Sequence, residues 1–290
     1  MALPSRVEVG SGTLPLLPNA APAADQSSPI YFLHIPKTAG TTFHRFVASQ
    51  FLPSEICPTH LWHELINLPS EVLDQCTYIW GHFYAYLWRH ASRPMRYMTF
   101  LRHPVERSLS HYGHIMRHDG HYLHARAREL NDFGAFLRDP ILSTTLQNFQ
   151  VKSLALDLDP HSIAATLSQE SLNQLLLEQT LETAKPALPV EEMLAIAQCR
   201  LDQMCFVGIS ERLEESVALS CAVFGWQTPP KVDSHNVNPE RIQARDVRDS
   251  DLALLLELNA ADMALYESAT RLFDGARQAL LRDEQTPNGV

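Results

Sequence analysis

Short apolar runs alternate along this chain with longer stretches in which apolar residues recur at helical spacing. The runs are five or six residues long, the length of a buried strand. Strands that alternate with helices predict an α/β fold, with a mostly parallel sheet covered by helices on both faces. The predicted strands are residues 30–34, 77–81, 96–101 and 204–208.

The longer periodic stretches predict helices that follow these strands. One helix is expected over residues 42–51 and another over residues 211–226. A third begins at Pro104, because proline is favoured at the first position of a helix. Ser250 is predicted to cap a long C-terminal helix that continues through Phe273.

The chain is predicted to contain one folded domain with flexible ends. Residues 1–29 are rich in Pro, Ala, Gly and Ser, which predicts a disordered leader or linker that would suit tethering to a biosynthetic assembly. The domain is expected over residues 30–280, and residues 281–290 are expected to form a flexible tail. Within the domain, residues 120–200 are largely helical in pattern and predict a helical lobe over the active site.

Charge and cysteine content exclude several classes of function. The net charge of −10 opposes binding to nucleic acid, to an anionic membrane or to a polyanionic glycan. The five cysteines are odd in number and show no CxxC spacing, so neither a disulfide framework nor a zinc site is expected. No apolar run approaches the roughly 18 residues of a membrane span. No signal peptide is visible either, so a cytoplasmic protein is expected.

The strongest chemical signal is the segment IYFLHIPKTAGTTF at residues 30–43. A buried strand ends, a short loop follows and a helix starts, so backbone N–H groups converge where a phosphate binds. Lys37 precedes Gly40, which is the reverse of the nucleoside triphosphatase loop GxxxxGK[ST]. The alternative is a plain strand–turn–helix with a surface lysine. The residues expected to bind the ligand are Lys37, Thr38, Ala39, Gly40, Thr41 and Thr42.

A second phosphate signal is the segment FLRHPVERSLSHY at residues 100–112. Arg102 ends a buried strand, and Ser110 follows eight residues later on the helix that Pro104 opens. The arginine offers a planar, permanently charged fork for phosphate oxygens, and the serine hydroxyl adds a donor. Arg107 is expected either to contact the ligand or to form a surface ion pair.

Together the two segments resemble the PAPS-dependent sulfotransferases, in particular their heparan 2-O-sulfotransferase-like and bacterial branch. PAPS is 3′-phosphoadenosine-5′-phosphosulfate. The resemblance implies that the loop around Lys37 binds the 5′-phosphosulfate, and that Arg102 and Ser110 bind the 3′-phosphate. It extends over roughly residues 30–275. Supporting stretches are residues 148–156, 206–226 and 256–269, and Asn148, Gln150 and Lys152 fall where family members approach the nucleotide or the lobe.

His82 is the candidate general base. It follows the strand at residues 77–81 and should therefore emerge at the same sheet edge as Lys37 and Arg102. A neutral imidazole suits this role because its pKa lies near the operating pH. The segment YIWGHFYAYL also resembles the Gly-His step of the heparan 2-O-sulfotransferase-like branch, where the histidine acts as base. The alternatives for the base are Glu106 and a carboxylate from the lobe, in which case His82 has a purely structural role.

Further histidines share one face of the helix that Pro104 opens. They are spaced as zinc ligands can be, but no HExxH motif or paired cysteine accompanies them, so no metal site is expected. A face that is solvated or that borders the acceptor is the preferred interpretation. The residues are His111, His114 and His118.

The sequence therefore predicts a sulfotransferase with a P-loop-like sheet. It would move a sulfuryl group from PAPS to an acceptor hydroxyl by in-line transfer, with His82 as base, Lys37 on the leaving group and no metal requirement. Adenosine 3′,5′-bisphosphate would be the product. The acceptor is expected to be neutral: a small molecule, a lipid-like or polyketide-like compound, or a carbohydrate. The alternatives are an ATP-dependent phosphate-loop kinase and a module that binds PAPS or its product without catalysis.

Overall fold

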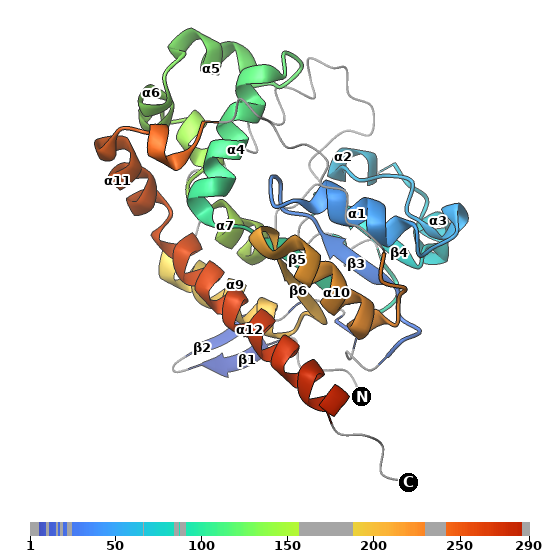
Figure 1. The fold of residues 1–290 in the computed structure, drawn as a ribbon. Coiled ribbons are helices and arrows are strands. Elements are labelled where there is room, and N and C mark those ends of the chain that lie inside the picture. Colours follow the sequence, from blue (N-terminus) through green and yellow to red (C-terminus); the bar gives the residue numbers. More distant parts are fainter. Residues whose placement is uncertain are drawn as a thin grey trace.

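The central sheet has four parallel strands in the order β4-β3-β5-β6, with helices packed around it (Figure 1). This arrangement confirms the predicted α/β fold and the four predicted strand positions. The strands are β3 (Ile30–Leu33), β4 (Tyr78–Gly81), β5 (Arg96–Leu101) and β6 (Phe206–Ile209). The computed structural model describes residues 6–9, 12–15, 17, 20–21, 25–65, 67–83, 87, 91–156, 188–229 and 242–285.

The strands are mostly apolar because the sheet is covered on both sides. Tyr31, Phe32 and Leu33 in β3 have no exposed surface. Tyr31 packs edge-on against Tyr97 of β5, with 5.5 Å between the ring centroids. An uninterrupted apolar run, rather than an alternating one, is therefore the pattern that this sheet requires.

The strand register brings the carboxyl ends of the strands to one edge of the sheet. Leu33, the last residue of β3, is paired with Gly81 of β4 and with Thr99 of β5. Because the strands are parallel, the loops that follow them all leave the sheet in the same direction. Residues that are far apart in the sequence are thereby brought together at this edge.

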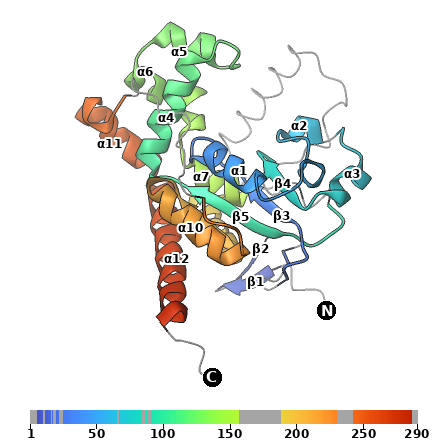
Figure 2. The same cartoon turned by 45° about the vertical axis from the view of Figure 1, so that its right-hand side comes forward.

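Helices cover the sheet and extend beyond it at one end (Figure 2). The helix predicted from Pro104 is confirmed, and the helix predicted over 42–51 starts two residues earlier. The helices are α1 (Gly40–Ala48), α2 (Trp62–Leu65), α3 (Ser70–Gln75), α4 (Pro104–Arg117), α5 (His124–Leu130), α6 (Phe133–Arg138), α7 (Phe149–Ala155), α9 (Val190–Asp202), α10 (Leu213–Phe224), α11 (Asp249–Leu258) and α12 (Ala260–Gln285).

A small helical lobe stands above the sheet edge, formed by α4, α5, α6 and α11 (Figure 1). It has its own apolar core, in which Leu109, Phe136 and Leu255 have no exposed surface. The prediction that all of residues 120–200 form this lobe is wrong in part, because α7 and α9 pack into the core of the sheet. Residues 157–187 lie outside the described part of the chain.

The C-terminal region contains two helices where the sequence predicts one. The helical path is interrupted at Asn259, which is almost fully buried. The side chain that caps the start of α12 is Asn148, from another part of the molecule. Ser250 does not cap a helix, because it is already the second residue of α11. Helix α12 continues through Gln285, into the segment expected to be a tail. In the part of the chain that the structure describes, no helix is both long and apolar enough to cross a membrane.

Residues that precede Ile30 contact the domain where the structure describes them. Strands β1 (Arg6–Val9) and β2 (Gly12–Pro15) form an antiparallel pair. Leu17 is buried, and its N–H donates to Gln203 Oε1 over 2.9 Å. The boundary at residue 30 stays a prediction, but these contacts show that residues on its N-terminal side pack against the domain.

Candidate functional site

The loop between β3 and α1 has an unusual backbone conformation. Lys37 and Ala39 both have positive φ angles, 73° and 65°. Non-glycine residues rarely adopt this conformation, and each such residue costs about 1–3 kcal/mol unless its surroundings hold it. Thr38, between them, is fully buried, and its Oγ1 donates to the carbonyl oxygen of Ile35 over 2.9 Å. This backbone strain is of the kind that clusters at ligand-binding loops.

Helix α1 begins directly at this loop, without a side-chain cap. Its N-cap residue, Ala39, provides no side-chain hydrogen bond to the first turn, and its carbonyl oxygen accepts the N–H groups of Thr42 and Phe43. The N–H groups that precede Thr42 point toward the loop and are placed to bind a ligand. Gly40 lies against the imidazole of His34, and a Cβ atom at position 40 would overlap that ring. The strand–loop–helix arrangement predicted for Lys37 to Thr42 is therefore present, with Thr41 half-buried and Thr42 buried in the first helical turn.

Arg102 lies beside this loop. Its Nη1 donates to the carbonyl oxygen of Lys37 over 3.1 Å, and the side chain is only 16% exposed. Glu106 and Glu211 lie 3.7 and 3.8 Å from its guanidinium nitrogens. The two segments predicted to bind phosphate are thus in direct contact. Ser110 is partly exposed in the second turn of α4, on the helix that begins two residues after Arg102.

Arg107 is buried, which contradicts the surface ion pair, one of the two roles predicted for it. Its side chain has no exposed surface, and its guanidinium lies over the ring of Phe149 at 4.1 Å. Nε donates to the carbonyl oxygen of Pro36, and Nη1 donates to that of Thr145. The residue therefore connects α4 to the β3–α1 loop from inside the protein.

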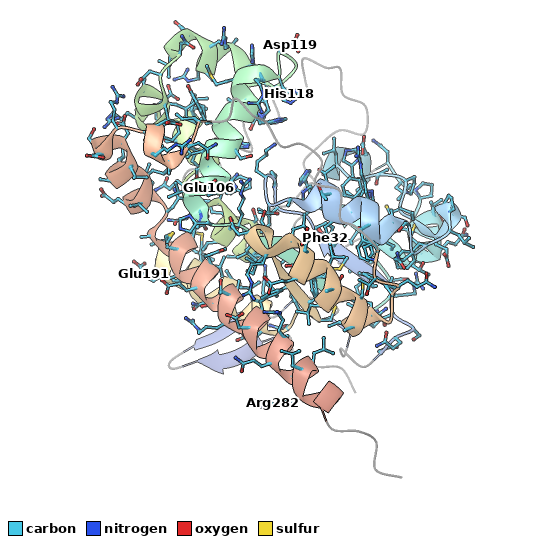
Figure 3. The ribbon with its side chains drawn as sticks, viewed as in Figure 1. Phe32, Glu106, His118, Asp119, Glu191 and Arg282 are labelled. Atoms are coloured by element: carbon cyan, nitrogen blue, oxygen red, sulfur yellow. The ribbon has the colours of Figure 1, made fainter. Side chains whose placement is uncertain are left out.

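Positive charge accumulates around Lys37. Burial, together with the neighbouring charges of Arg117, Arg102 and Arg107, lowers the pKa of Lys37 to about 8. Sequence analysis did not identify Arg117, which lies in the last turn of α4, because its proximity to Lys37 depends on tertiary structure. Figure 3 shows Glu106 on the same helix, closer to its beginning. Such a concentration of cations is suited to a ligand that carries several negative charges.

His82 follows β4 at the same sheet edge. Its Nδ1 lies 2.7 Å from the carbonyl oxygen of His34, and its backbone N–H donates to the carbonyl oxygen of His60. Since a carbonyl oxygen can only accept, Nδ1 carries the proton and Nε2 keeps its lone pair. Burial lowers the pKa of His82 to about 4, below the near-neutral value expected from the sequence, so the ring is neutral at pH 7 but is a weaker base than a solvated histidine. The ring is also stacked on His34, with 4.5 Å between centroids.

Two histidines of α4 form a cluster with two histidines that follow the helix. The ring centroids of His111 and His121 are 6.2 Å apart, and those of His114 and His118 are 4.1 Å apart. Burial, followed by the charge of Lys37, lowers the pKa of His114 to about 3. Among the described residues, no group of three or more His, Cys, Asp or Glu side chains is arranged to hold a metal ion.

Gln150, expected near the nucleotide or the lobe, contacts the backbone of Arg102. Its Oε1 accepts the Arg102 N–H over 3.0 Å, and its Nε2 donates to the Arg102 carbonyl oxygen over 2.9 Å. Lys152 is buried on the same helix, and burial lowers its pKa to about 8. Asp262, which sequence analysis missed, accepts the N–H of Gln150 from α12. The contact joins residues 112 positions apart, and no local pattern signals it.

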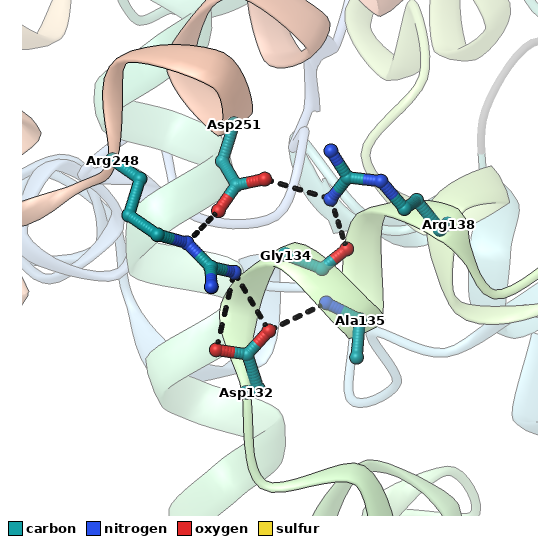
Figure 4. A network of polar contacts seen from close by, with 6 residues as sticks. All are labelled: Asp132, Gly134, Ala135, Arg138, Arg248 and Asp251. Atoms are coloured by element: carbon teal, nitrogen blue, oxygen red, sulfur yellow. Dashed lines mark hydrogen bonds and ion pairs between the residues drawn. The ribbon is translucent and has the colours of Figure 1, made fainter.

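A second polar cluster lies in the helical lobe (Figure 4). Arg248 donates to Asp251 over 2.6 Å and to Asp132 over 2.9 Å, and Arg138 donates to Asp251 over 2.7 Å. Gly134 lies beneath them, and a Cβ atom there would overlap Arg248 and Asp251. The cluster joins α6 to the start of α11.

Comparison of the chain with models of known protein families finds no match, and no curated protein matches it either. The resemblance to sulfotransferases therefore stays a prediction carried by the motifs at residues 30–43 and 100–112. The geometry at the sheet edge is an independent basis for a functional proposal.

Proposed function

We propose that this protein is a sulfotransferase that moves a sulfuryl group from PAPS to the hydroxyl group of an acceptor. The observation that carries the proposal is the hydrogen bond from Arg102 Nη1 to the Lys37 carbonyl oxygen. This bond joins the two segments predicted to bind phosphate, residues 30–43 and 100–112, at one sheet edge. A ligand with anionic groups at two positions requires such an arrangement. PAPS is such a ligand, with a phosphosulfate at the 5′ position and a phosphate at the 3′ position.

The residues present fit this donor. Arg102, Arg107 and Arg117 lie near Lys37; burial and then repulsion from these arginines lower the Lys37 pKa, and a bound anion would relieve the repulsion. The uncapped first turn of α1 offers backbone donors to the 5′ end. Arg102 and Ser110 would hold the 3′-phosphate.

The proposed chemistry assigns one role to each of two side chains. PAPS supplies the sulfuryl group: its sulfur–oxygen bond to phosphate breaks as the acceptor oxygen bonds to sulfur, and adenosine 3′,5′-bisphosphate leaves. His82 Nε2 takes the proton of the acceptor hydroxyl, because Nδ1 is already occupied by the His34 carbonyl oxygen. Lys37 stabilises the negative charge that develops on the leaving phosphate.

Ligand-induced stabilisation tests the donor. Adenosine 3′,5′-bisphosphate should raise the melting temperature of the protein, and ATP with Mg²⁺ should raise it far less. Equal shifts, or a larger one with ATP, would favour a kinase and contradict the proposal. The comparison is informative because ATP lacks the 3′-phosphate assigned to Arg102.

Group transfer is tested separately with PAPS and a panel of hydroxyl compounds. Alcohols, phenols, sugars and carrier-bound hydroxy acids are incubated with the protein, and the products are analysed by mass spectrometry for a sulfate adduct. An adduct that depends on His82 supports the proposed reaction. Binding of the bisphosphate without any adduct across the panel would instead indicate the non-catalytic binding module.

A further inference from the structure

We propose that Gln150 is a positioning residue that orients Arg102 toward the 3′-phosphate of the donor. The inference rests on the proposed function and adds to it a residue whose side chain does not itself contact the ligand. It is carried by the two hydrogen bonds through which the Gln150 amide holds the backbone of Arg102 at the end of β5.

The side-chain amide of Gln150 bonds to the backbone of Arg102 in the way that a neighbouring strand would. One amide accepts from the N–H and donates to the C=O of the same residue, at 3.0 and 2.9 Å. Gln150 has no exposed surface, so water cannot replace these bonds. Arg102 lies just beyond the last residue of β5, where strand pairing no longer holds the backbone. The amide of Gln150 therefore fixes the direction in which the Arg102 side chain leaves the sheet.

Gln150 is itself held by a reciprocal cap between two helices. The Asp262 carboxylate of α12 accepts the N–H groups of Gln150 and Val151 in the first turn of α7, at 3.0 and 2.8 Å. In return, Asn148 Oδ1 accepts the N–H groups of Ala261 and Asp262 in the first turn of α12, both at 3.1 Å. Each helix thus satisfies the N-terminal donors that the other leaves open.

This arrangement makes the position of Arg102 depend on α7 and α12. Asp262 has no exposed surface; burial raises the pKa of its carboxyl group, and the N–H groups of Val151 and Gln150 oppose that shift. A group that is oriented before the ligand arrives loses less conformational freedom on binding. The gain in binding affinity should therefore be confined to ligands that contact Arg102.

The test compares two nucleotides that differ at the 3′ position. Gln150→Met keeps the length of the side chain and removes both hydrogen bonds. The dissociation constant for adenosine 3′,5′-bisphosphate should rise about tenfold, the equivalent of about 1.4 kcal/mol. The dissociation constant for 5′-AMP, which has no 3′-phosphate, should change less than about twofold, because binding of 5′-AMP does not depend on Arg102. Calorimetry measures both constants.

Ser153→Ala is the matched control. Ser153 is also buried on α7, and its Oγ donates to the carbonyl oxygen of Phe149 over 2.7 Å, away from Arg102. This variant should leave both dissociation constants unchanged. In an Arg102→Ala background, Gln150→Met should have no further effect on the bisphosphate, since the two residues act through one contact.

The outcomes separate the inference from the proposed function. If the wild-type protein does not bind the bisphosphate, the proposed function fails and the inference fails with it. If the wild type binds and Gln150→Met weakens both nucleotides equally, or neither, only the inference is overturned. Should Gln150→Met not fold, Gln150→Glu serves instead: its carboxylate accepts the Arg102 N–H but cannot donate to the carbonyl oxygen. The same selective loss is expected.

Discussion

Two polar clusters of this protein differ in how their charges are balanced. In the lobe, the carboxylates of Asp132 and Asp251 are each bonded to an arginine, and the arginines Arg138 and Arg248 match them in number. At the sheet edge, three arginines lie near Lys37, and Glu106 and Glu211 lie 3.7 and 3.8 Å from the guanidinium nitrogens of Arg102. In the lobe, arginines and carboxylates are equal in number, whereas the described residues at the sheet edge include more cations than carboxylates, which is the balance that the proposed anionic ligand requires.

The two clusters also use glycine differently. Gly134 makes room for an ion-pair network between two helices. Gly40 makes room for the His34 ring, and the His34 carbonyl oxygen in turn orients His82. The same absence of a side chain thus supports helix packing in one case and the orientation of a candidate base in the other. Variants in the two regions should accordingly separate stability from function.

The largest effect is expected from His82→Ala. Loss of a general base lowers turnover by about 10²–10⁴-fold, while the affinity for adenosine 3′,5′-bisphosphate should stay within about twofold. Steady-state kinetics with an acceptor found in the panel and calorimetry with the bisphosphate measure the two quantities. His44→Ala is the control, because His44 is also stacked among these aromatic rings but is bonded to Tyr78. Turnover equal to that of the wild type would remove His82 from the mechanism.

Arg102→Ala should weaken binding of adenosine 3′,5′-bisphosphate about a hundredfold, since it removes a charged partner of the phosphate. The melting temperature should change little. The matched variant in the lobe, Arg248→Ala, should leave nucleotide affinity unchanged. An Arg102→Ala protein with normal affinity would contradict the 3′-phosphate assignment.

Binding of the bisphosphate should weaken as the pH rises through 8. Lys37 is charged below its pKa of about 8 and neutral above it, so one cation is lost from the site in the alkaline range. The dissociation constant should be level below this pH and rise by up to about tenfold per unit above it. In Lys37→Arg the alkaline rise should disappear, because an arginine stays charged. Calorimetry between pH 6.5 and 9.5 tests both proteins, and an unchanged alkaline rise in Lys37→Arg would mean that another group is responsible.

The smallest functional effect is expected from Gly134→Ala. The added methyl group would overlap Arg248 and Asp251, and such overpacking costs about 1–3 kcal/mol of unfolding free energy. Denaturant unfolding should detect this loss, and nucleotide affinity should be unaffected. A decrease in affinity would show that the lobe and the site are coupled.

Local sequence pattern was sufficient for the sheet and for the positions of the candidate site. The four strands are short, mostly apolar runs, and Pro104 marks the start of α4. The parallel arrangement then placed His82 at the same edge as Lys37 and Arg102, as the sequence predicts. Whether these residues bind PAPS and transfer a sulfuryl group stays a prediction.

The contacts that the sequence did not reveal all join distant segments. Arg107 resembles a surface residue of a helix, but it is buried because Phe149 covers its guanidinium. The expected single C-terminal helix breaks at Asn259 because Asn148 provides caps for a new helix start. Neither effect has a periodicity or a motif that could be read locally.

The reciprocal cap also has a consequence for synthesis of the protein. Arg102 and Gln150 leave the ribosome well before Asp262, which follows Gln150 by 112 residues. Until α12 has been made, the first turn of α7 lacks the carboxylate that anchors it. A nascent chain can therefore build its sheet early, but the proposed nucleotide site is fully anchored only when the final helix docks.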